Sequence, residues 1–553
     1  MQHFEKIIKK FLRYSINNEI AKSKIILTDD VFLHFYIPLQ KQNKTNMKKL
    51  FFLAVAMMAA VATSAKMSYT VEIDTVGKYL NVKLQYVASE KGQQKVELQM
   101  PIWAPGYYDV LNYPKYVTDF KATKTNGTAL TWSKYRKSTW IVNMAGADTI
   151  LVSYRTYANV MDVADSRIRP EGAFIAGNGT FMYEQGHKYE PVEVSYIIPD
   201  NWKYVSTGLK AEKGTKCKFI VPDFDILYDS PILFGNHFVE KFTHNGHEYE
   251  FAFDPGDDYE GSTFKKDFIA MVDAATEIMK EVPYDNYCII NMEGVGGGLE
   301  HLNSQADYSS GRFTTKSRAD YIRELDFIAH EYFHLYNVKR IRPIELGPFD
   351  YSQEAFTPLL WFSEGFTSYY SAQMLRRGKI ITTEELLGIY SRYIHDIEIY
   401  EGHKHMTLRQ SSYDIWLDFM GDKGNHRDVA FSYYNKGSYM GLLFDAKIRT
   451  TTKNERSLDD FMRLLYNRYY KELQRGFTEE EFWQALQEIM GTTQEATDAA
   501  ALLRRYVDTT DDIDYDALLN PIGIMLDHET WQLSLMEKPA KQVAKMRKAL
   551  IGE

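Results

Sequence analysis

The sequence is poor in cysteine and in long apolar runs. Two cysteines among 553 residues, Cys217 and Cys288, exclude a scaffold stapled by disulfides, and we expect both to be inert buried thiols. The apolar run at residues 50–62 spans 13 residues, which is too short to cross a bilayer comfortably. The chain is therefore not expected to be an integral membrane protein.

Positive charge is also in short supply. Lys and Arg number 65 against 74 Asp and Glu, which gives a formal net charge of −9. Because basic residues gather near the N-terminus, residues 66–553 alone carry a net charge of −15. A protein this acidic repels phosphate backbones, so we expect no nucleic-acid partner. With 45% apolar and 14% aromatic residues, the chain is expected to be globular, with several domains.

Residues 47–65 have the pattern of a signal peptide. Two lysines precede the apolar run, and small residues follow it up to Ala65, where we expect cleavage. We interpret Met47 as the true start and residues 1–46 as an untranslated leader or extension. The mature protein is expected to be exported, periplasmic or secreted, with no stable membrane insertion after the signal is removed.

The hydrophobic pattern of residues 66–255 has a period of two, and turn residues interrupt it. This pattern predicts many short strands rich in β-branched and aromatic side chains. The clearest cover residues 69–74, 79–87, 95–100, 149–157 and 192–198. We therefore expect an N-terminal antiparallel β-sandwich over residues 66–255.

After residue 256 the period becomes helical, so the predicted fold class is multidomain α+β. A buried strand is predicted at 287–292, among helices at 268–282, 319–337, 358–377 and 384–400. Further helices are predicted at 434–450, 457–474, 479–490 and 494–506. We divide this part into a catalytic domain at 256–395, a helical domain at 396–526 and a tail at 527–553.

The sequence His330-Glu331-Tyr332-Phe333-His334 has the pattern H-E-x-x-H. On a helix, positions i and i+4 lie on one face, so both imidazoles can reach a single Zn²⁺. Glu331 then lies near the open coordination position, where it can accept a proton from water. Apolar neighbours on both sides indicate that this helix is buried.

A catalytic zinc needs a third protein ligand. Asn337 and Arg340 occupy the positions of the glycine and third histidine of the extended motif, which excludes the three-histidine class. The remaining candidates are the downstream carboxylates Glu345, Asp350, Glu354 and Glu364. Only Glu364 lies inside an apolar predicted helix, where an unpaired carboxylate is costly unless a metal neutralises it. A salt bridge to Arg or Lys is the alternative.

Two further segments can complete a peptidase. Tyr434 begins a predicted helix, and its hydroxyl can stabilise the oxyanion formed when water attacks a carbonyl. Gly297 and Gly298 precede Glu300; glycines let the backbone approach a substrate closely, and a glutamate can hold a protonated α-amine. The alternative for this second segment is a glycine-rich turn with an exposed Glu.

Two segments, HEYFHLYNVKRIRP (330–343) and LLWFSEGFTSYY (359–370), resemble the glycyl aminopeptidase family, which is metallopeptidase family sixty-one of the gluzincins. WAPGYY (103–108) is similar to a turn of that family's β domain, and residues 506–526 are similar to the end of its helical domain. The resemblance implies a thermolysin-like catalytic domain. It implies one Zn²⁺ per chain, with Glu331 as general base and His330, His334 and Glu364 as ligands.

The resemblance also covers residues that contact the substrate. Y-x-K-G at 434–437 is similar to a segment of the broader aminopeptidase group, which makes Tyr434 the oxyanion stabiliser. GGLEH at 297–301 stands where those enzymes keep G-x-M-E-N, which makes Glu300 the amine ligand, although Leu and His replace Met and Asn. The family implies peptides with N-terminal Gly or Ala as substrates. Its frequent C-terminal PDZ domain does not fit in residues 527–553.

We therefore expect an exported zinc aminopeptidase. Two alternatives stay open. In the first, the chain is a zinc endopeptidase with the same machinery, and Glu300 does not bind an amine. In the second, it is a non-catalytic binding protein built on a peptidase fold.

Overall fold

The computed structural model describes residues 66–254, 259, 263–294, 297–309, 317–417 and 426–552. The predicted leader at 1–46 and signal peptide at 47–65 lie outside the described residues. Among the helices that are described, none combines the length and the apolar character needed to cross a lipid bilayer.

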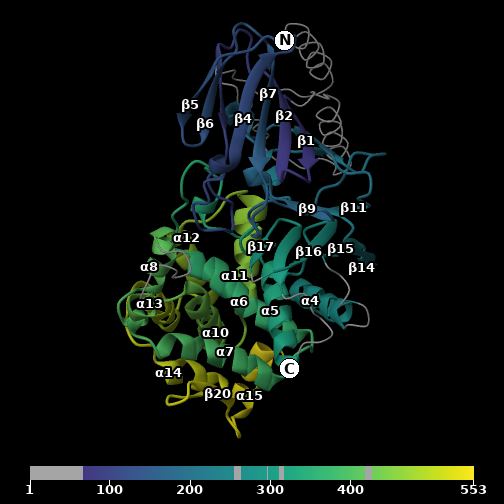
Figure 1. The fold of residues 1–553 in the computed structure, drawn as a ribbon. Helices are drawn as coiled ribbons and strands as arrows, with labels where there is room; N and C mark the ends of the chain where they lie inside the picture. Colours follow the sequence, from purple (N-terminus) through teal and green to yellow (C-terminus); the bar gives the residue numbers. More distant parts are fainter. Residues whose placement is uncertain are drawn as a thin grey trace, which may run out of the picture. The chain divides into compact units, whose positions relative to one another are not determined.

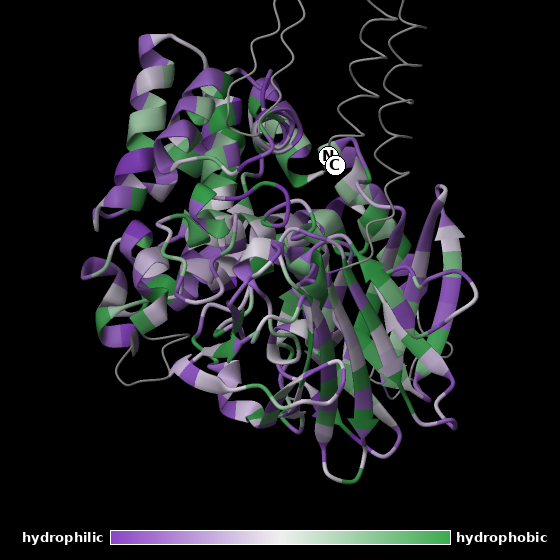
Figure 2. Ribbon diagram, turned by 90° about the horizontal axis from the view of Figure 1, so that it is seen from above, coloured by the Kyte–Doolittle hydropathy of each residue, from purple (hydrophilic) through white to green (hydrophobic). Residues whose placement is uncertain are grey.

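Six strands form the largest sheet of the N-terminal region, in the order β12-β10-β1-β2-β7-β4 (Figure 1). Their bounds are Met67–Asp74 (β1), Tyr79–Val87 (β2), Val117–Lys124 (β4), Thr149–Tyr157 (β7), Val192–Ile197 (β10) and Lys218–Val221 (β12). Buried and exposed side chains alternate along β1, β2 and β7 because successive residues point to opposite faces. Green and purple bands mark this alternation along the strands in Figure 2.

Two smaller sheets complete this region, in the orders β11-β13-β9-β8 and β3-β6-β5. Their strands are β3 (Lys95–Gln99), β5 (Trp132–Arg136), β6 (Thr139–Asn143), β8 (Arg167–Ile168), β9 (Gly172–Ile175), β11 (Tyr204–Thr207) and β13 (Ile232–Gly235). The predicted β-rich N-terminal region is confirmed. One pair, β1 with β10, runs parallel, because the chain passes through β8 and β9 before β10 rejoins the first sheet.

A mixed five-stranded sheet follows, in the order β14-β15-β16-β18-β17. Its strands are β14 (Phe238–His244), β15 (His247–Asp254), β16 (Asn286–Glu293), β17 (Gly298–Glu300) and β18 (Ser304–Ser309). Tyr287 and Ile289 of β16 pack with the helices α4 (Phe264–Met279) and α5 (Arg318–Phe333), whereas Cys288 and Ile290 pack with the β region. The sheet is thus covered on both faces, and β17 forms its edge.

Helices make up most of the remaining chain (Figure 1). They are α6 (Thr367–Arg377), α7 (Thr383–Glu398), α8 (Leu408–Tyr413), α9 (His426–Val429), α10 (Tyr433–Thr451), α11 (Leu458–Leu465), α12 (Glu479–Met490), α13 (Gln494–Asp508), α14 (Tyr515–Leu519) and α15 (Lys541–Ile551). A short hairpin of β19 (Ile524–Asp527) and β20 (Gln532–Leu535) precedes α15. The predicted α+β class, with helices following the β region, is confirmed.

Local sequence signals set several helix ends. Thr382 and Glu385 form a capping box at the start of α7, and Thr478 and Glu481 form another at α12. The predicted helix at 358–377 differs in detail, because a π-helical turn at Trp361–Phe366 precedes α6. Both cysteines are free thiols; Cys288 is buried and Cys217 is partly buried.

Candidate active site

The two histidines of the H-E-x-x-H motif lie at the C-terminal end of α5. Ser317 begins the helix by accepting a hydrogen bond from the backbone N–H of Asp320 at 3.2 Å. Ile328 and Phe333 are fully buried in the core. His330 and His334 lie on a different face of α5 from Ile328, and both line the cavity.

Glu364 reaches the same point from the π-helical turn Trp361–Phe366. Asn337 links this turn to the end of α5, because its amide donates to the carbonyl oxygens of Phe362 at 3.0 Å and Ser363 at 3.2 Å. Glu364 is only 2% exposed. A π-helical turn inside a helix is frequent at functional sites.

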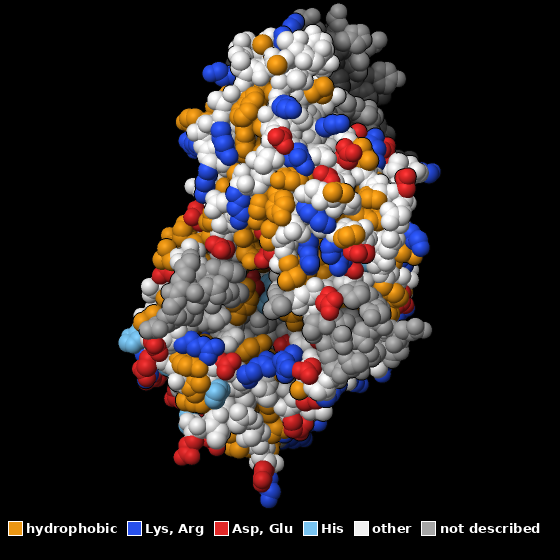
Figure 3. Space-filling model, viewed as in Figure 1, with side chains coloured by type: hydrophobic (Ala, Val, Ile, Leu, Met, Phe, Trp, Pro, Cys, Tyr) orange, Lys and Arg blue, Asp and Glu red, His pale blue; other side chains and the backbone are white. Residues whose placement is uncertain are grey.

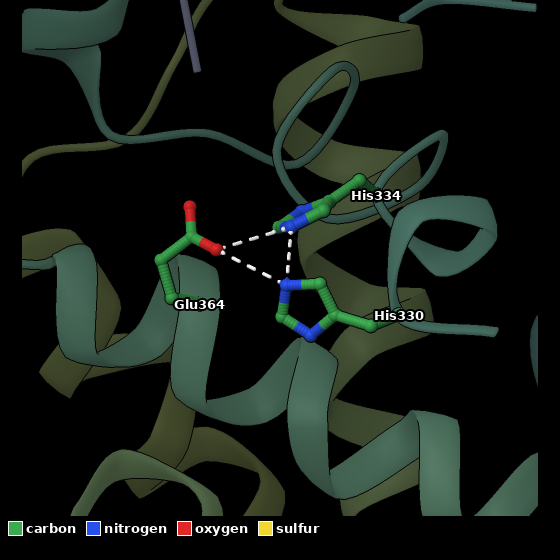
Figure 4. A group of neighbouring side chains, drawn as sticks. All are labelled: His330, His334 and Glu364. Carbon is green, nitrogen blue, oxygen red and sulfur yellow. Dashed lines mark hydrogen bonds and ion pairs between the residues drawn. The ribbon is translucent and has the colours of Figure 1, made fainter. Parts of the chain in front are cut away.

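The three side chains converge on one point (Figure 4). The Nε2 atoms of His330 and His334 lie 2.9 Å apart. One carboxylate oxygen of Glu364, Oε2, lies 3.3 Å from the first Nε2 and 3.1 Å from the second. Ligand atoms on a tetrahedral zinc are about 3.3 Å apart for bond lengths near 2.0–2.1 Å. The spacing therefore fits a single zinc ion.

Hydrogen bonds orient the ring nitrogens for metal binding. Nδ1 of His334 lies 2.7 Å from the carbonyl oxygen of Asn337, which only accepts, so in the neutral imidazole Nδ1 carries the hydrogen and Nε2 offers its lone pair to a metal. Nδ1 of His330 lies 3.0 Å from Oγ of Ser368. Such outer partners fix metal-binding histidines in one tautomer. Two imidazole nitrogens and a carboxylate are the donor set that zinc prefers in catalytic sites.

The electrostatics of this cluster also favour a cation. Burial lowers the pKa of His334, but the carboxylates of Glu364 and Glu300 outweigh burial and raise it to about 10. Burial raises the pKa of Glu364, but the two histidines outweigh burial and bring it well below its usual range. The buried carboxylate is thus held ionised next to the imidazoles, where a metal would satisfy all three groups.

Of the four carboxylates considered as third ligand, only Glu364 joins this cluster. Among the described residues, the groups spaced to hold a metal contain neither Glu345, Asp350 nor Glu354. Glu345 accepts a hydrogen bond from Thr357, and Asp350 accepts one from the backbone of Ser352 in its own turn. The salt bridge to Arg or Lys considered for Glu364 is also absent among the described residues, because its ion pairs are with the two histidines.

Glu331 lies beside His334 and against the edge strand β17. A Cβ atom on Gly298 would lie 2.3 Å from Oε1 and 2.8 Å from Cγ of Glu331, so any other residue here would displace the Glu331 side chain. Burial raises the pKa of Glu331 well above its usual range, and Asp307 and Glu300 add to this against the lowering effect of His334. A carboxyl group in this environment is suited to taking up a proton and passing it on. Gly297 lines the cavity next to Gly298.

Tyr434 lies in the first turn of α10. Ser432 caps the helix by accepting a hydrogen bond from the backbone N–H of Tyr434 at 3.3 Å. The ring of Tyr434 lies 6.1 Å from that of His330, measured between centroids. Tyr434 also lines the cavity, so its side chain lies beside the metal ligands.

The turn that carries Glu364 and the helix that carries Tyr434 are in backbone contact. A Cβ atom on Gly365 would lie 2.3 Å from Cα of Gly437, and one on Gly437 would lie 2.3 Å from the carbonyl oxygen of Trp361. Two glycines are thus needed where the elements cross. This contact explains the glycine of the Y-x-K-G segment.

Glu300 is buried rather than exposed on a turn, with 3% of its surface accessible. Its carboxylate, that of Glu331 and a ring nitrogen of His334 all lie within 4.8 Å of one another. Nζ of Lys339 lies 3.5 Å from Oε1 of Glu300. The expected amine ligand therefore lies next to the metal ligands, and a lysine accompanies it.

The sequence did not indicate that Tyr108 contributes to the site. This buried residue belongs to the N-terminal β region, and its hydroxyl donates to Oε1 of Glu364 at 3.1 Å. The WAPGYY segment marked the turn, but nothing in it signals a contact with a carboxylate 256 positions away.

The two histidines and Glu364 line one cavity of about 630 Å³ together with Glu331, Glu300 and Tyr434. This volume is typical of small-molecule sites. Figure 3 shows a hollow near the middle of the face that it presents. The helix α5 contributes one continuous face to the cavity, because its lining residues follow the i, i+3, i+4 spacing. They are Arg323, Asp326, Phe327, His330, Glu331 and His334.

Two histidines one helical turn apart, an intervening glutamate and a glutamate from a following helix define the site of a gluzincin-type metallopeptidase. Comparison with known families agrees. The M61 glycyl aminopeptidase family matches residues 323–440, and the peptidase M61 N-terminal domain matches residues 68–236. The chain belongs to the M61 glycyl aminopeptidase family, and it is a metallopeptidase of that family.

Solved structures share this fold. An aminopeptidase N family protein from Idiomarina loihiensis has a TM-score of 0.77 at 24% identity, covering 83% of this chain and 79% of that chain. An M1 zinc metallopeptidase from Deinococcus radiodurans, bound to a Tyr-Ser-Ala substrate, has a TM-score of 0.51 at 11% sequence identity. The match covers 81% of this chain and 93% of that chain. Yeast LTA4 hydrolase in complex with bestatin has a TM-score of 0.51 at 15% sequence identity, and the match covers 82% of this chain and 70% of that chain. No curated protein matches the sequence.

Proposed function

We propose that the chain is an exported zinc aminopeptidase that removes small N-terminal residues, Gly or Ala, from peptides. The observation that carries this proposal is the grouping of His330, His334 and Glu364 in one cavity with Glu331 and Glu300. The first three form a zinc site, Glu331 is in reach of an attacking water, and Glu300 offers a negative charge to an amine.

The zinc ligands in this proposal are His330, His334 and Glu364, with one Zn²⁺ per chain. When bound there, zinc polarises the scissile carbonyl and lowers the pKa of a water molecule. Glu331 accepts the proton of the attacking water and then passes it to the leaving amine. Its buried setting, which favours the protonated carboxyl, suits it to hold the proton between the two steps.

Tyr434 and β17 act on the substrate backbone. The hydroxyl of Tyr434 donates to the oxyanion that develops on the attacked carbonyl. Among the described residues β17 pairs only with β18, and its other edge is the place where an extended peptide would add as a further strand. Gly298 keeps this edge free of side chains next to Glu331.

Glu300 makes the site an exopeptidase in this proposal. Its carboxylate forms a charge-assisted hydrogen bond with the substrate's α-ammonium group, which places the first peptide bond at the metal. The proximity of Glu300 to His334 and Glu331 supports this geometry, because it leaves room for only one residue between amine and scissile bond.

The test compares the peptide Gly-Ala-Ala-Phe with its N-acetylated form, with products followed by mass spectrometry. Release of free Gly from the unblocked peptide alone supports an aminopeptidase. Equal cleavage of both peptides makes the protein an endopeptidase, and no cleavage by zinc-loaded protein favours a non-catalytic binding protein.

Export is tested separately. Residues 47–65 carry the proposal, and fractionation of cells that produce the full chain checks it. We expect the protein outside the cytoplasm, with a new N-terminus after Ala65; a cytoplasmic protein with an intact N-terminus contradicts this part.

A further inference from the structure

A buried ion pair accompanies the amine ligand. We propose that Lys339 determines the specificity of this site for a free N-terminus, because it pairs with Glu300 and fixes the orientation of that carboxylate toward the substrate amine. The proposal rests on the proposed aminopeptidase function and deepens it. Lys339 touches neither the metal ligands' side chains nor the reacting atoms, so it acts as a positioning residue.

Lys339 bridges two acidic side chains. Its Nζ lies 2.9 Å from Oδ1 of Asp229 and 3.5 Å from Oε1 of Glu300. The lysine side chain is only 8% exposed, and that of Glu300 is 4% exposed. Burial lowers the pKa of Lys339, but Asp229 and Glu300 outweigh burial and raise it. Lys339 is therefore a permanent cation in the interior beside the active-site cavity.

The N-terminal β region anchors this lysine. Asp229 accepts hydrogen bonds from Nδ1 of His301 at 3.1 Å and from the backbone N–H of Leu302 at 2.7 Å, besides that from Lys339. His301 is the residue that replaces the family group's Asn after Glu300. The replacement thus gives Asp229 a third partner, which fixes Asp229 and through it Lys339.

The β region also confines Glu300 from the opposite direction. A Cβ atom on Gly106 would lie 2.6 Å from both carboxylate oxygens of Glu300. The backbone of the WAPGYY turn therefore packs directly against the carboxylate. With Lys339 near Oε1 and Gly106 against the group, the carboxylate has little freedom to turn.

Charge compensation explains why a lysine is needed here. Glu300 and the neighbouring Glu331 are both almost fully buried, and carboxylates that are shielded from water repel one another strongly. One cation shared between Asp229 and Glu300 leaves a single negative charge for the substrate's ammonium group. Without that cation, Glu300 loses both its compensation and its fixed position.

The experiment measures a discrimination ratio, defined as kcat/KM for Gly-Ala-Ala-Phe divided by kcat/KM for its N-acetylated form. Zinc-loaded full-length wild type is compared with Lys339→Met and Lys339→Arg. We expect the ratio to fall at least about tenfold in Lys339→Met, as expected for loss of one charge-assisted hydrogen bond. Lys339→Arg restores most of the ratio. A general loss of structure would instead lower both rates together and leave the ratio unchanged.

Two further variants keep the test decisive. Because Lys339→Met leaves Asp229 without its cation, the double variant Asp229→Asn/Lys339→Met removes both charges and is expected to fold and to show the same low ratio. Lys188→Met is the matched control, since Lys188 is also buried and lies 3.9 Å from Asp225, and no ion pair joins it to Glu300 among the described residues. Its ratio is expected to equal that of wild type.

Each outcome separates the two proposals. If wild type shows no discrimination, the aminopeptidase function itself is wrong. If wild type discriminates and Lys339→Met keeps the same ratio in a folded protein, Lys339 is a bystander and this inference fails. A ratio that rises in Lys339→Met also overturns it, because the lysine would then be masking Glu300.

Discussion

The hydroxyl of Tyr108 donates a hydrogen bond to Oε1 of Glu364 at 3.1 Å, across 256 positions of the chain. The other oxygen of that carboxylate, Oε2, faces the two histidines. The β region thus fixes which oxygen of Glu364 faces the histidines, and this oxygen is the one that would bind zinc in the proposed site. Together with Gly106 and Asp229, Tyr108 makes the β region part of the active site rather than an appended domain.

The variant Tyr108→Phe tests this contact. Loss of the donor leaves Oε1 of Glu364 buried without its partner, and the carboxylate is then free to rotate. Removal of such an outer partner costs about 10- to 100-fold in metal affinity. We expect zinc to be lost to a chelator at a correspondingly lower chelator concentration, with activity falling in parallel.

Tyr113→Phe is the control for Tyr108→Phe. The hydroxyl of Tyr113 is also buried and donates to the carbonyl oxygen of Ala164 at 2.6 Å, away from the metal ligands. We expect a similar loss of stability but wild-type zinc affinity. Equal zinc affinity in Tyr108→Phe and wild type would show that Glu364 is oriented without Tyr108.

The crossing of Gly365 and Gly437 predicts a second effect. In Gly437→Ala the new methyl group would lie 2.3 Å from the carbonyl oxygen of Trp361, so the backbones must separate. We expect a loss of about 1–3 kcal/mol in the free energy of unfolding, as for overpacked cores. We also expect kcat/KM to fall in protein that is still folded, because the shift moves Glu364 and Tyr434 apart. Urea unfolding and kcat/KM measure the two effects.

Gly388→Ala is the control for Gly437→Ala, and we expect it to stabilise the protein. Gly388 lies within α7 and a Cβ atom there would meet nothing within 4 Å. Alanine at such a position stabilises by about 0.4–1 kcal/mol. If Gly437→Ala proved as harmless as Gly388→Ala, the close crossing would not be a constraint.

Asp229 gives stability a defined pH dependence. Burial raises its pKa, but Lys339 and His301 outweigh burial and bring it from 3.8 down to about 2. Because the folded carboxyl is the stronger acid, its contribution is fully present above pH 4 and is lost as the pH falls toward 2. We expect Asp229→Asn to lower the free energy of unfolding by about 2 kcal/mol at pH 7. Urea unfolding at several pH values should show this difference shrink below pH 4; a difference independent of pH would contradict the ion pair.

Much of the fold followed from local sequence patterns. The bounds of β2, β7 and α12 agree with prediction at both ends, because strict alternation or a capping box marks them. The π-helical turn at Trp361–Phe366 could not be predicted, since apolar periodicity alone does not reveal one extra residue in a turn. The parallel pairing of β1 with β10 depends on the path of the chain between them.

The grouping of His330, His334 and Glu364 was predictable, because the two histidines share a short helical motif and Glu364 is an acid in an apolar segment. Tyr108, Gly106 and Asp229 were not, because their partners lie far away in sequence and their residue types are ordinary in β regions. Lys339 belongs to the NVKRIRP segment, but its role depends on Asp229, which no local pattern connects to it.

The variant Glu331→Gln tests the central claim most directly. The protein is purified with zinc, its metal content is determined, and release of Gly from Gly-Ala-Ala-Phe is measured beside wild type. Because Glu331 is not a ligand, we expect one zinc per chain in both proteins and no detectable turnover in the variant. Turnover that survives in zinc-loaded Glu331→Gln would contradict the account.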